Sequence, residues 1–117
     1  MLKPSLPHAR LADPQLFREA CYIAGRWVGS SGAAVTVDNP ATGVAIGSVP
    51  KLGRADARVA IDAADRALAP WRSMLAKERA QLLRRWSELI LANQEDLARI
   101  MTLEQGKPLS ESRTEVA

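Results

Sequence analysis

Cysteine and histidine each occur only once in this 117-residue sequence, and both scarcities exclude classes of protein. Cys21 cannot form an internal disulfide, which argues against a disulfide-stabilised secreted domain and fits a reducing compartment. His8 has no second metal ligand at a useful spacing, so a histidine-based metal centre is not indicated. A lone cysteine can serve as a nucleophile, but Cys21 opens a predicted strand with no base nearby in sequence, which favours a structural thiol.

Long apolar runs are also absent from the sequence. No stretch approaches the roughly 20 residues that a membrane-spanning helix needs. The first twenty residues contain three prolines and two acids, and they lack the uninterrupted apolar centre of a secretory signal. A mitochondrial presequence is the less favoured alternative, because the same acids and prolines weaken an amphipathic helix. We therefore expect a cytoplasmic protein with no membrane partner and a flexible lead-in over residues 1–20.

The charge balance does not indicate an anionic partner. The formal net charge is +3, from 16 basic and 13 acidic residues. Clustered basic residues would mark nucleic-acid binding, but here bases and acids alternate along the second half of the chain, as on solvated helix faces. With no nucleic-acid-binding motif present either, we expect no nucleic-acid partner.

Strand signals dominate the first half of the chain after the lead-in. Aromatic and β-branched residues in 21–28 favour a hairpin, and Gly25-Arg26 suits its two-residue reversal. A further strand is predicted over 35–37, ending at the turn signal Asp38-Asn39-Pro40. Another is predicted over 44–49.

Helical periodicity begins after Gly53. Residues 54–69 carry small apolar residues three and four apart, which predicts a helix with a narrow alanine face that Pro70 ends. A second helix is predicted over 76–91, with an i,i+4 pair between Arg84 and Glu88. Its apolar stripe is expected to be buried and consists of Leu82, Leu83, Trp86 and Ile90.

Two more helices are predicted towards the end of the sequence. Asn93 is a good N-cap for the third, with Asp96 in a capping-box-like position, and Gly106 is the expected left-handed terminator. Pro108 suits the first turn of a fourth helix. No breaker or cap follows before Ala117, so we expect this chain to be part of a longer protein.

Other candidate groups for chemistry give weak signals. The glycines Gly25, Gly29, Gly32 and Gly43 do not form a phosphate-binding loop, because none follows a strand and opens a helix. Tryptophans at 27, 71 and 86 favour packing in a core or at a domain edge over stacking on a cofactor. The carboxylates Glu88, Glu95, Asp96 and Glu104 are scattered over predicted solvent faces. We therefore assign no catalytic and no cofactor-binding residue within this chain.

Four short blocks in a fixed order carry a resemblance to a known family. They are Tyr22-Ile23-Ala24-Gly25-Arg26-Trp27, Asn39-Pro40-Ala41-Thr42-Gly43, the stretch from Asp56 to Trp71, and Glu104-Gln105-Gly106-Lys107-Pro108-Leu109. Together they resemble the opening of an aldehyde dehydrogenase. The residues Lys77-Glu78-Arg79 and Leu103 to Leu109 are most similar to the succinate-semialdehyde dehydrogenase branch.

The resemblance implies an α/β parent with a Rossmann-like cofactor domain and a parallel sheet. Residues 21–117 would then be the N-terminal part of the cofactor-binding domain, a strand region followed by three to four helices. The parent would use NAD or NADP to oxidise a small aldehyde, succinate semialdehyde first, and would assemble as a homodimer or homotetramer. Its thiolate, oxyanion donors and general base all lie outside this chain, so the chain alone is expected to be inactive.

The same resemblance implies one binding site. In this family an acidic residue two before the Gly-Lys-Pro triplet helps to hold a structural monovalent cation with backbone carbonyls ahead of the Asn-Pro turn. In this sequence the corresponding groups are Glu104 and the carbonyls of Val37 and Asp38. Oxygen ligands of this kind suit a hard cation.

Two further expectations concern the second helix. Leu75 stands where many relatives carry a Ser or Thr cap, and Ser73 could substitute by starting that helix earlier. The alternative to the dehydrogenase interpretation is an independent helical interaction module, which would use the apolar stripe of this helix as its partner surface.

Overall fold

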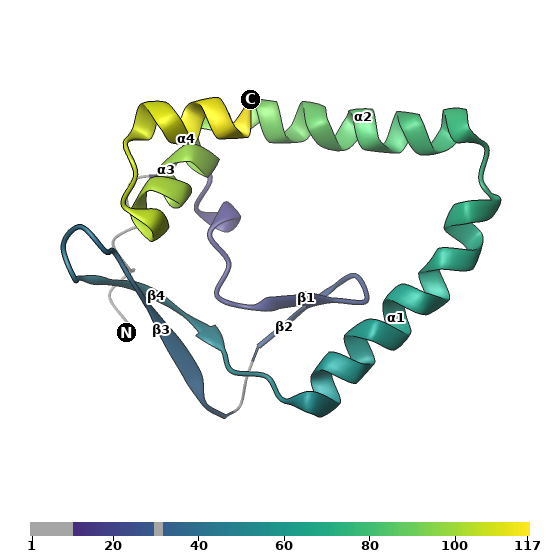
Figure 1. Cartoon of the computed structure of the whole chain (residues 1–117), viewed down its shortest axis with the longest axis horizontal. Helices are drawn as coiled ribbons and strands as arrows, with labels where there is room; N and C mark the ends of the chain where they lie inside the picture. The colour runs from purple at the N-terminus through teal and green to yellow at the C-terminus, as the bar shows by residue number, and fades with distance from the viewer. Residues whose placement is uncertain (1–10, 30–31) are drawn as a thin grey trace.

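The computed structural model describes residues 11–29 and 32–117. Its elements are the 3-10 helix η2 (Pro14–Leu16), the strands β1 (Cys21–Ile23), β2 (Arg26–Val28), β3 (Ala34–Asp38) and β4 (Ala45–Pro50), and the helices α1 (Arg54–Ser73), α2 (Ala76–Ala92), α3 (Gln94–Gln105) and α4 (Leu109–Val116). Figure 1 shows an open frame in which α1 and α2 form two long sides, and the hairpins, α3 and α4 form the rest. Among the described residues, none of the helices combines the length and the hydropathy that a membrane-spanning segment requires.

The first hairpin reverses one residue earlier than the sequence predicts. β1 and β2 are antiparallel, with Tyr22 opposite Trp27 and Ile23 opposite Arg26. The turn therefore consists of Ala24 and Gly25, and both have positive φ (51° and 78°). Two consecutive positive-φ residues match the twist of a tight hairpin, so Gly25 takes the second turn position rather than the first.

The second hairpin closes through a tightly bonded loop. β3 and β4 are antiparallel, with a register shift between Val37 and Asp38. In the loop, the Asn39 carbonyl accepts hydrogen bonds from the N–H groups of Thr42 and Gly43 at 3.2 and 2.7 Å. The Asn39 side-chain oxygen accepts another from the Ala41 N–H at 2.9 Å. An Asx turn of this kind holds a short loop without help from the rest of the protein.

The first long helix continues through Pro70, so the prediction that Pro70 ends it was wrong. α1 extends to Ser73. A proline removes one backbone N–H donor. Because Pro70 lies in the last turn of α1, few backbone hydrogen bonds of the helix follow it. At the other end, the Asp56 carboxylate accepts a hydrogen bond from the Gly53 N–H at 3.0 Å and so caps the helix start.

α2 begins at Ala76 without a side-chain cap from residue 75. The Glu78 carboxylate instead accepts a hydrogen bond from the Leu75 N–H at 2.9 Å, which is half of a capping box. Ser73 does not substitute as a cap, because its hydroxyl donates to the Pro70 carbonyl within α1. Among the described contacts, Glu88 forms an ion pair with Arg85 at 3.7 Å, and not with Arg84 as predicted.

The small core lies where the N-terminal segment crosses β4 and α3. Its buried apolar side chains are Leu11, Phe17, Ile46 and Ala98. Phe17 lies over Gly47, where an added Cβ would come within 2.9 Å of the ring. Glu19 accepts a hydrogen bond from the Ser48 N–H at 2.7 Å. Leu11 and Phe17 therefore anchor part of the segment that the sequence predicts as a flexible lead-in, and residues 1–10 lie outside the described residues.

Asp96 has a different role from the predicted one. Its carboxylate oxygens accept hydrogen bonds from the N–H groups of Ala12 and Asp13, at 3.0 and 2.8 Å. The residue is 5% exposed, so it does not lie on a solvent face. The Asn93 side chain does not cap α3 either, since its amide donates to the Leu89 carbonyl of α2 at 2.8 Å. The capping-box prediction was wrong because the Asp96 carboxylate binds the backbone of the N-terminal segment instead of the Asn93 N–H.

The frame exposes more surface than a compact protein of this size. The radius of gyration is 16.8 Å, whereas a compact chain of this length has about 13 Å. The accessible surface is 8930 Å², against about 6,200 Å² for a compact protein of this mass. Within residues 11–29 and 32–117, the buried apolar side chains are too few to stabilise a frame of this extent by themselves.

Candidate functional site

The first and third sequence blocks meet where the β1–β2 hairpin lies against α1. Tyr22, Ile23 and Ala24 face the alanine side of the helix across a shallow hollow of about 270 Å³, whose α1 wall consists of Ala60, Ala63, Ala64 and Ala67. The predicted narrow alanine face therefore does approach a neighbour, as small side chains allow. This surface is apolar on both sides and offers no group for chemistry.

The hairpin carries an exposed aromatic cluster. The rings of Tyr22 and Trp27 lie 5.1 Å apart at 60°, and the Arg18 guanidinium lies 5.2 Å from the centre of the Trp27 ring. Tyr22 and Trp27 are 64% and 52% exposed, so this cluster lies at the surface of the described residues rather than in a core.

The second and fourth blocks meet at the end of α3. Gly106 ends α3 with φ 74°, which confirms the predicted left-handed terminator. A Cβ at Gly106 would lie 2.9 Å from Cγ of Pro40, in the Asn39–Gly43 loop. The Glu104-to-Leu109 block therefore contacts the Asn39-to-Gly43 block. Position 106 requires glycine for two reasons: its φ is positive, and Pro40 leaves no room for a Cβ.

The groups predicted to hold a cation flank this contact. Val37 and Asp38 end β3 at its register shift, two residues before Pro40, and Glu104 lies in the last turn of α3, two residues before Gly106. Glu104 and Asp38 are exposed and Val37 is half-buried. Across the described residues, no three His, Cys, Asp or Glu side chains gather in a metal-binding cluster. A site here would therefore depend on backbone carbonyls together with one carboxylate.

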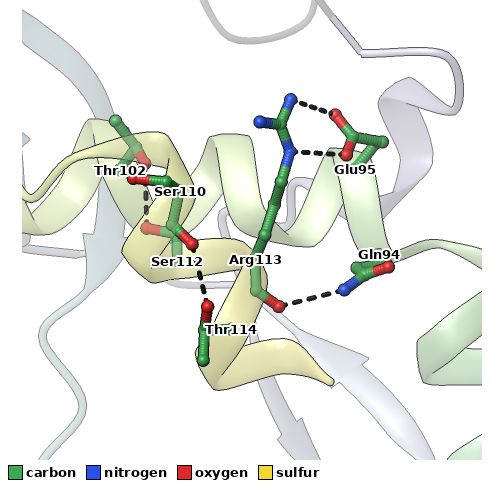
Figure 2. Close-up of polar contacts among 7 residues, drawn as sticks. All are labelled: Gln94, Glu95, Thr102, Ser110, Ser112, Arg113 and Thr114. Carbon is green, nitrogen blue, oxygen red and sulfur yellow. Dashed lines mark hydrogen bonds and ion pairs between the residues drawn. The ribbon is translucent and has the colours of Figure 1, made fainter.

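Polar contacts hold α4 against α3, as Figure 2 shows. The Arg113 guanidinium donates two hydrogen bonds to the Glu95 carboxylate at 2.7 and 3.0 Å, and the Gln94 amide donates to the Arg113 carbonyl at 2.9 Å. The hydroxyls of Thr102 and the buried Ser112 lie 2.9 Å apart. The Lys107 ammonium pairs with the Glu115 carboxylate. These contacts are structural, because they fix the position of α4 relative to α3.

The ion pair between Glu95 of α3 and Arg113 of α4 shifts the pKa values of both groups. The hydrogen bond and charge of Arg113 hold the pKa of the Glu95 carboxyl below its ordinary value, and Glu95 raises the pKa of Arg113 in return. Both shifts keep the pair ionised at neutral pH. Neither shift moves a group towards the neutral range where a general acid or base operates, and both Glu95 oxygens already accept hydrogen bonds from Arg113.

α2 presents an apolar face that the described residues leave open. Leu82, Leu83 and Trp86 are 52%, 53% and 65% exposed, whereas Ile90, the fourth residue of the predicted stripe, is half-buried. The described residues therefore cover only one end of this stripe. One turn earlier, Nε of Arg79 is sealed from solvent and has no hydrogen-bond partner in the described part. A buried donor without an acceptor costs about 1–3 kcal/mol.

The remaining candidates are scattered. Cys21 is a free, half-buried thiol in β1. Trp71 is half-buried at the end of α1, and His8 lies outside the described residues. A cavity of about 450 Å³ between α3 and α4 is lined by Arg99, Thr102, Leu103 and Leu109, with no nucleophile or base among them. The geometry therefore brings together no set of side chains for catalysis within the described residues.

Comparison with known proteins shows which family has this scaffold. The aldehyde dehydrogenase family model matches residues 27–117. The chain is 56% identical over 109 residues to the glutarate-semialdehyde dehydrogenase of Pseudomonas aeruginosa, and 52% identical to the NADP(+) succinate-semialdehyde dehydrogenase of Escherichia coli. Each match covers 92% of this chain. The chain belongs to the aldehyde dehydrogenase family.

Solved structures agree with this assignment. The aldehyde dehydrogenase from Brucella melitensis biovar abortus superposes with a TM-score of 0.89 at 50% identity, over 92% of this chain and 22% of that one. More distant relatives, 32% identical, were solved with NADP or NAD+. The chain spans 23% of the length of the curated relatives described above. Two hairpins followed by four helices are thus the N-terminal part of the aldehyde dehydrogenase fold, as predicted.

Proposed function

We propose that this chain is the N-terminal scaffold of an NAD(P)-dependent dehydrogenase that oxidises a semialdehyde carrying a distal carboxylate. The observation that carries the proposal is identity above 50% to two enzymes named for glutarate and succinate semialdehyde, over nearly the whole chain. These two substrates share an aldehyde at one end and a carboxylate at the other. Succinate semialdehyde, the smaller one, remains the substrate that we place first.

The chain contributes structure to this reaction rather than chemistry. Oxidation of an aldehyde by this route needs a thiolate, oxyanion donors and a base for the attacking water. The bound nicotinamide would accept the hydride. Cys21 has no base among its described contacts and lies in the hairpin, so we place the reacting thiolate, with the cofactor and carboxylate sites, in the remainder of the parent. We further propose a cytoplasmic parent that forms a homodimer or homotetramer.

The test uses the protein encoded by the complete reading frame and, separately, the 117-residue chain. For the complete protein, kcat/KM on succinate or glutarate semialdehyde is expected to exceed that on butanal by about 100-fold or more, because a site built for a carboxylate leaves its charges unpaired with a neutral analogue. NAD(P)H absorbance measures the rate. The 117-residue chain is expected to give no turnover. Equal rates on butanal, or turnover by the chain alone, would contradict the proposal.

We propose in addition that Glu104 and the carbonyls of Val37 and Asp38 hold a structural monovalent cation in the parent. The support is the contact between Gly106 and Pro40, which holds the end of α3 against the loop after β3, and the hard-oxygen chemistry of these three groups. Such a cation would tie the second and fourth sequence blocks together.

The host for testing this site is a chimera in which the chain replaces the matching segment of the Pseudomonas aeruginosa enzyme. Replacing choline with potassium or sodium is expected to raise its Tm by a few degrees, because a bound cation stabilises only the folded state. Glu104→Gln should abolish that increase, whereas the control Glu111→Gln, an exposed carboxylate in the first turn of α4, should retain it. A cation response that survives Glu104→Gln would reject the site.

A further inference from the structure

The N-terminal segment, residues 11–19, joins two parts of the molecule that are far apart in sequence. At one end, the Asp96 carboxylate of α3 accepts two backbone hydrogen bonds from the segment, at 3.0 and 2.8 Å. At the other end, the ring of the buried Phe17 lies over Gly47 of β4. Figure 1 shows the segment, in purple, running from the side of α3 towards the start of β1. The segment therefore connects α3 to the second hairpin.

The contact on β4 falls at the irregular point of its pairing with β3. Gly47 lies opposite Val37, and Ala45 lies opposite Asp38. Ile46 is therefore the extra residue of a β-bulge, and it is 2% exposed. A bulge disrupts the ladder and bends the bulged strand, so the position of β4 at this point sets the direction of the β3 carbonyls across from it. The ring over Gly47 contacts the residue directly beside the bulge.

α3 is attached to the second hairpin at both of its ends. Its C-terminal end contacts the hairpin loop directly, where Gly106 meets Pro40. Its first turn is attached through the N-terminal segment, by Asp96 at one end of the segment and by Glu19, which accepts the Ser48 N–H at 2.7 Å, at the other. A single attachment would let the helix pivot about one end, whereas two attachments fix its direction relative to the hairpin.

The cation ligands proposed above lie on the two sides of this connection. Glu104 belongs to α3, and the carbonyls of Val37 and Asp38 belong to β3 at the bulge. Moving either element changes the spacing of three oxygens that must approach one ion together. We propose that the N-terminal segment positions this site, by holding α3 and the bulge at the spacing that the cation requires. The inference rests on the proposed cation site and makes Phe17 a positioning residue rather than a ligand.

The experiment measures the potassium or sodium concentration above which the Tm of the Pseudomonas aeruginosa chimera begins to rise, with choline keeping the ionic strength constant. This onset follows the dissociation constant of the cation. Phe17→Ala removes the ring over Gly47 and should raise the onset by about 10-fold or more, as substitutions beside a metal site do. Phe17→Leu keeps an apolar cover on the strand and should restore most of the affinity.

Two further variants separate positioning from a simple loss of stability. Gly25→Ala strains the turn of the first hairpin, where φ is 78°, and should lower Tm at every cation concentration without moving the onset. Glu19→Ala removes the hydrogen bonds to Ser48 without opening a cavity, because the Glu19 side chain is exposed. It should raise the onset by about 3-fold, the share of one ordinary hydrogen bond.

The outcomes distinguish this inference from the site on which it rests. If Phe17→Ala and Glu19→Ala leave the onset unchanged while Glu104→Gln abolishes the response, the positioning role is overturned and the site is retained. An unsubstituted chimera whose Tm responds to neither cation rejects the site, and this inference with it. An onset raised equally by Phe17→Ala and by Gly25→Ala shows that lost stability alone weakens the response, and it also overturns the proposal.

Discussion

Replacing Asp96 with alanine in the chimera is expected to release the N-terminal segment from α3. The carboxylate is 5% exposed and accepts one N–H on each oxygen, from Ala12 and Asp13. A hydrogen bond to a charged group contributes about 1.5–3 kcal/mol, and the two amides keep no other described acceptor, so we expect a local loss of about 3 kcal/mol. Amide hydrogen exchange in residues 11–17 should then accelerate by about 100-fold.

The neighbouring residue provides the control for this experiment. Glu95 lies on the same turn of α3 and also accepts two hydrogen bonds, but it is exposed and binds the exposed Arg113. An exposed ion pair contributes little to stability, so Glu95→Ala should leave exchange in residues 11–17 unchanged. Asp96→Asn should give an intermediate result, because its amide offers one acceptor oxygen and one donor. Equal exchange in the Asp96→Ala and Glu95→Ala variants would disprove the role assigned to Asp96.

The role of Asp96 also shows where sequence reasoning failed. Three residues after Asn93, an aspartate fits a local capping pattern, and its actual partners lie more than 80 residues away. A local pattern contains no information about such a contact. Prolines and polar residues in the first twenty positions gave no sign that Leu11 and Phe17 would be buried. The one available signal was Gly47, a glycine within a predicted strand, which can mark close approach of another group.

The elements themselves were largely predictable. Both hairpins, the starts of α1 and α2, and the end of α3 at Gly106 follow from turn residues and local periodicity, which act over a few positions. The continuation of α1 through Pro70 was missed because the cost of proline depends on how many intrahelical bonds remain beyond it. For the apolar stripe of α2, periodicity shows that Leu82, Leu83 and Trp86 need burial, but it does not show which polypeptide buries them.

The second large effect on stability is expected at Gly106, where the fourth sequence block contacts Pro40 of the second. Gly106→Ala in the chimera should cost about 3 kcal/mol. One part is the left-handed φ of 74°, which costs a residue with a Cβ about 1–2 kcal/mol. The other is overlap with Pro40, because the new Cβ would lie 2.9 Å from its Cγ. Unfolding in urea, followed by tryptophan fluorescence, measures the loss.

Gly43 isolates the backbone contribution to this effect. It lies in the Asn39–Gly43 loop with φ 68°, yet a Cβ there would meet nothing within 4 Å. Gly43→Ala should therefore cost only the part of the loss that comes from φ, about 1–2 kcal/mol. Adding Pro40→Ala should recover the overlap part in the Gly106→Ala variant, because it removes the atom that the new Cβ would strike. If the two glycine variants lose equal stability, the contact between the second and fourth blocks does not hold the loop against α3, and the cation site beside it loses its structural support.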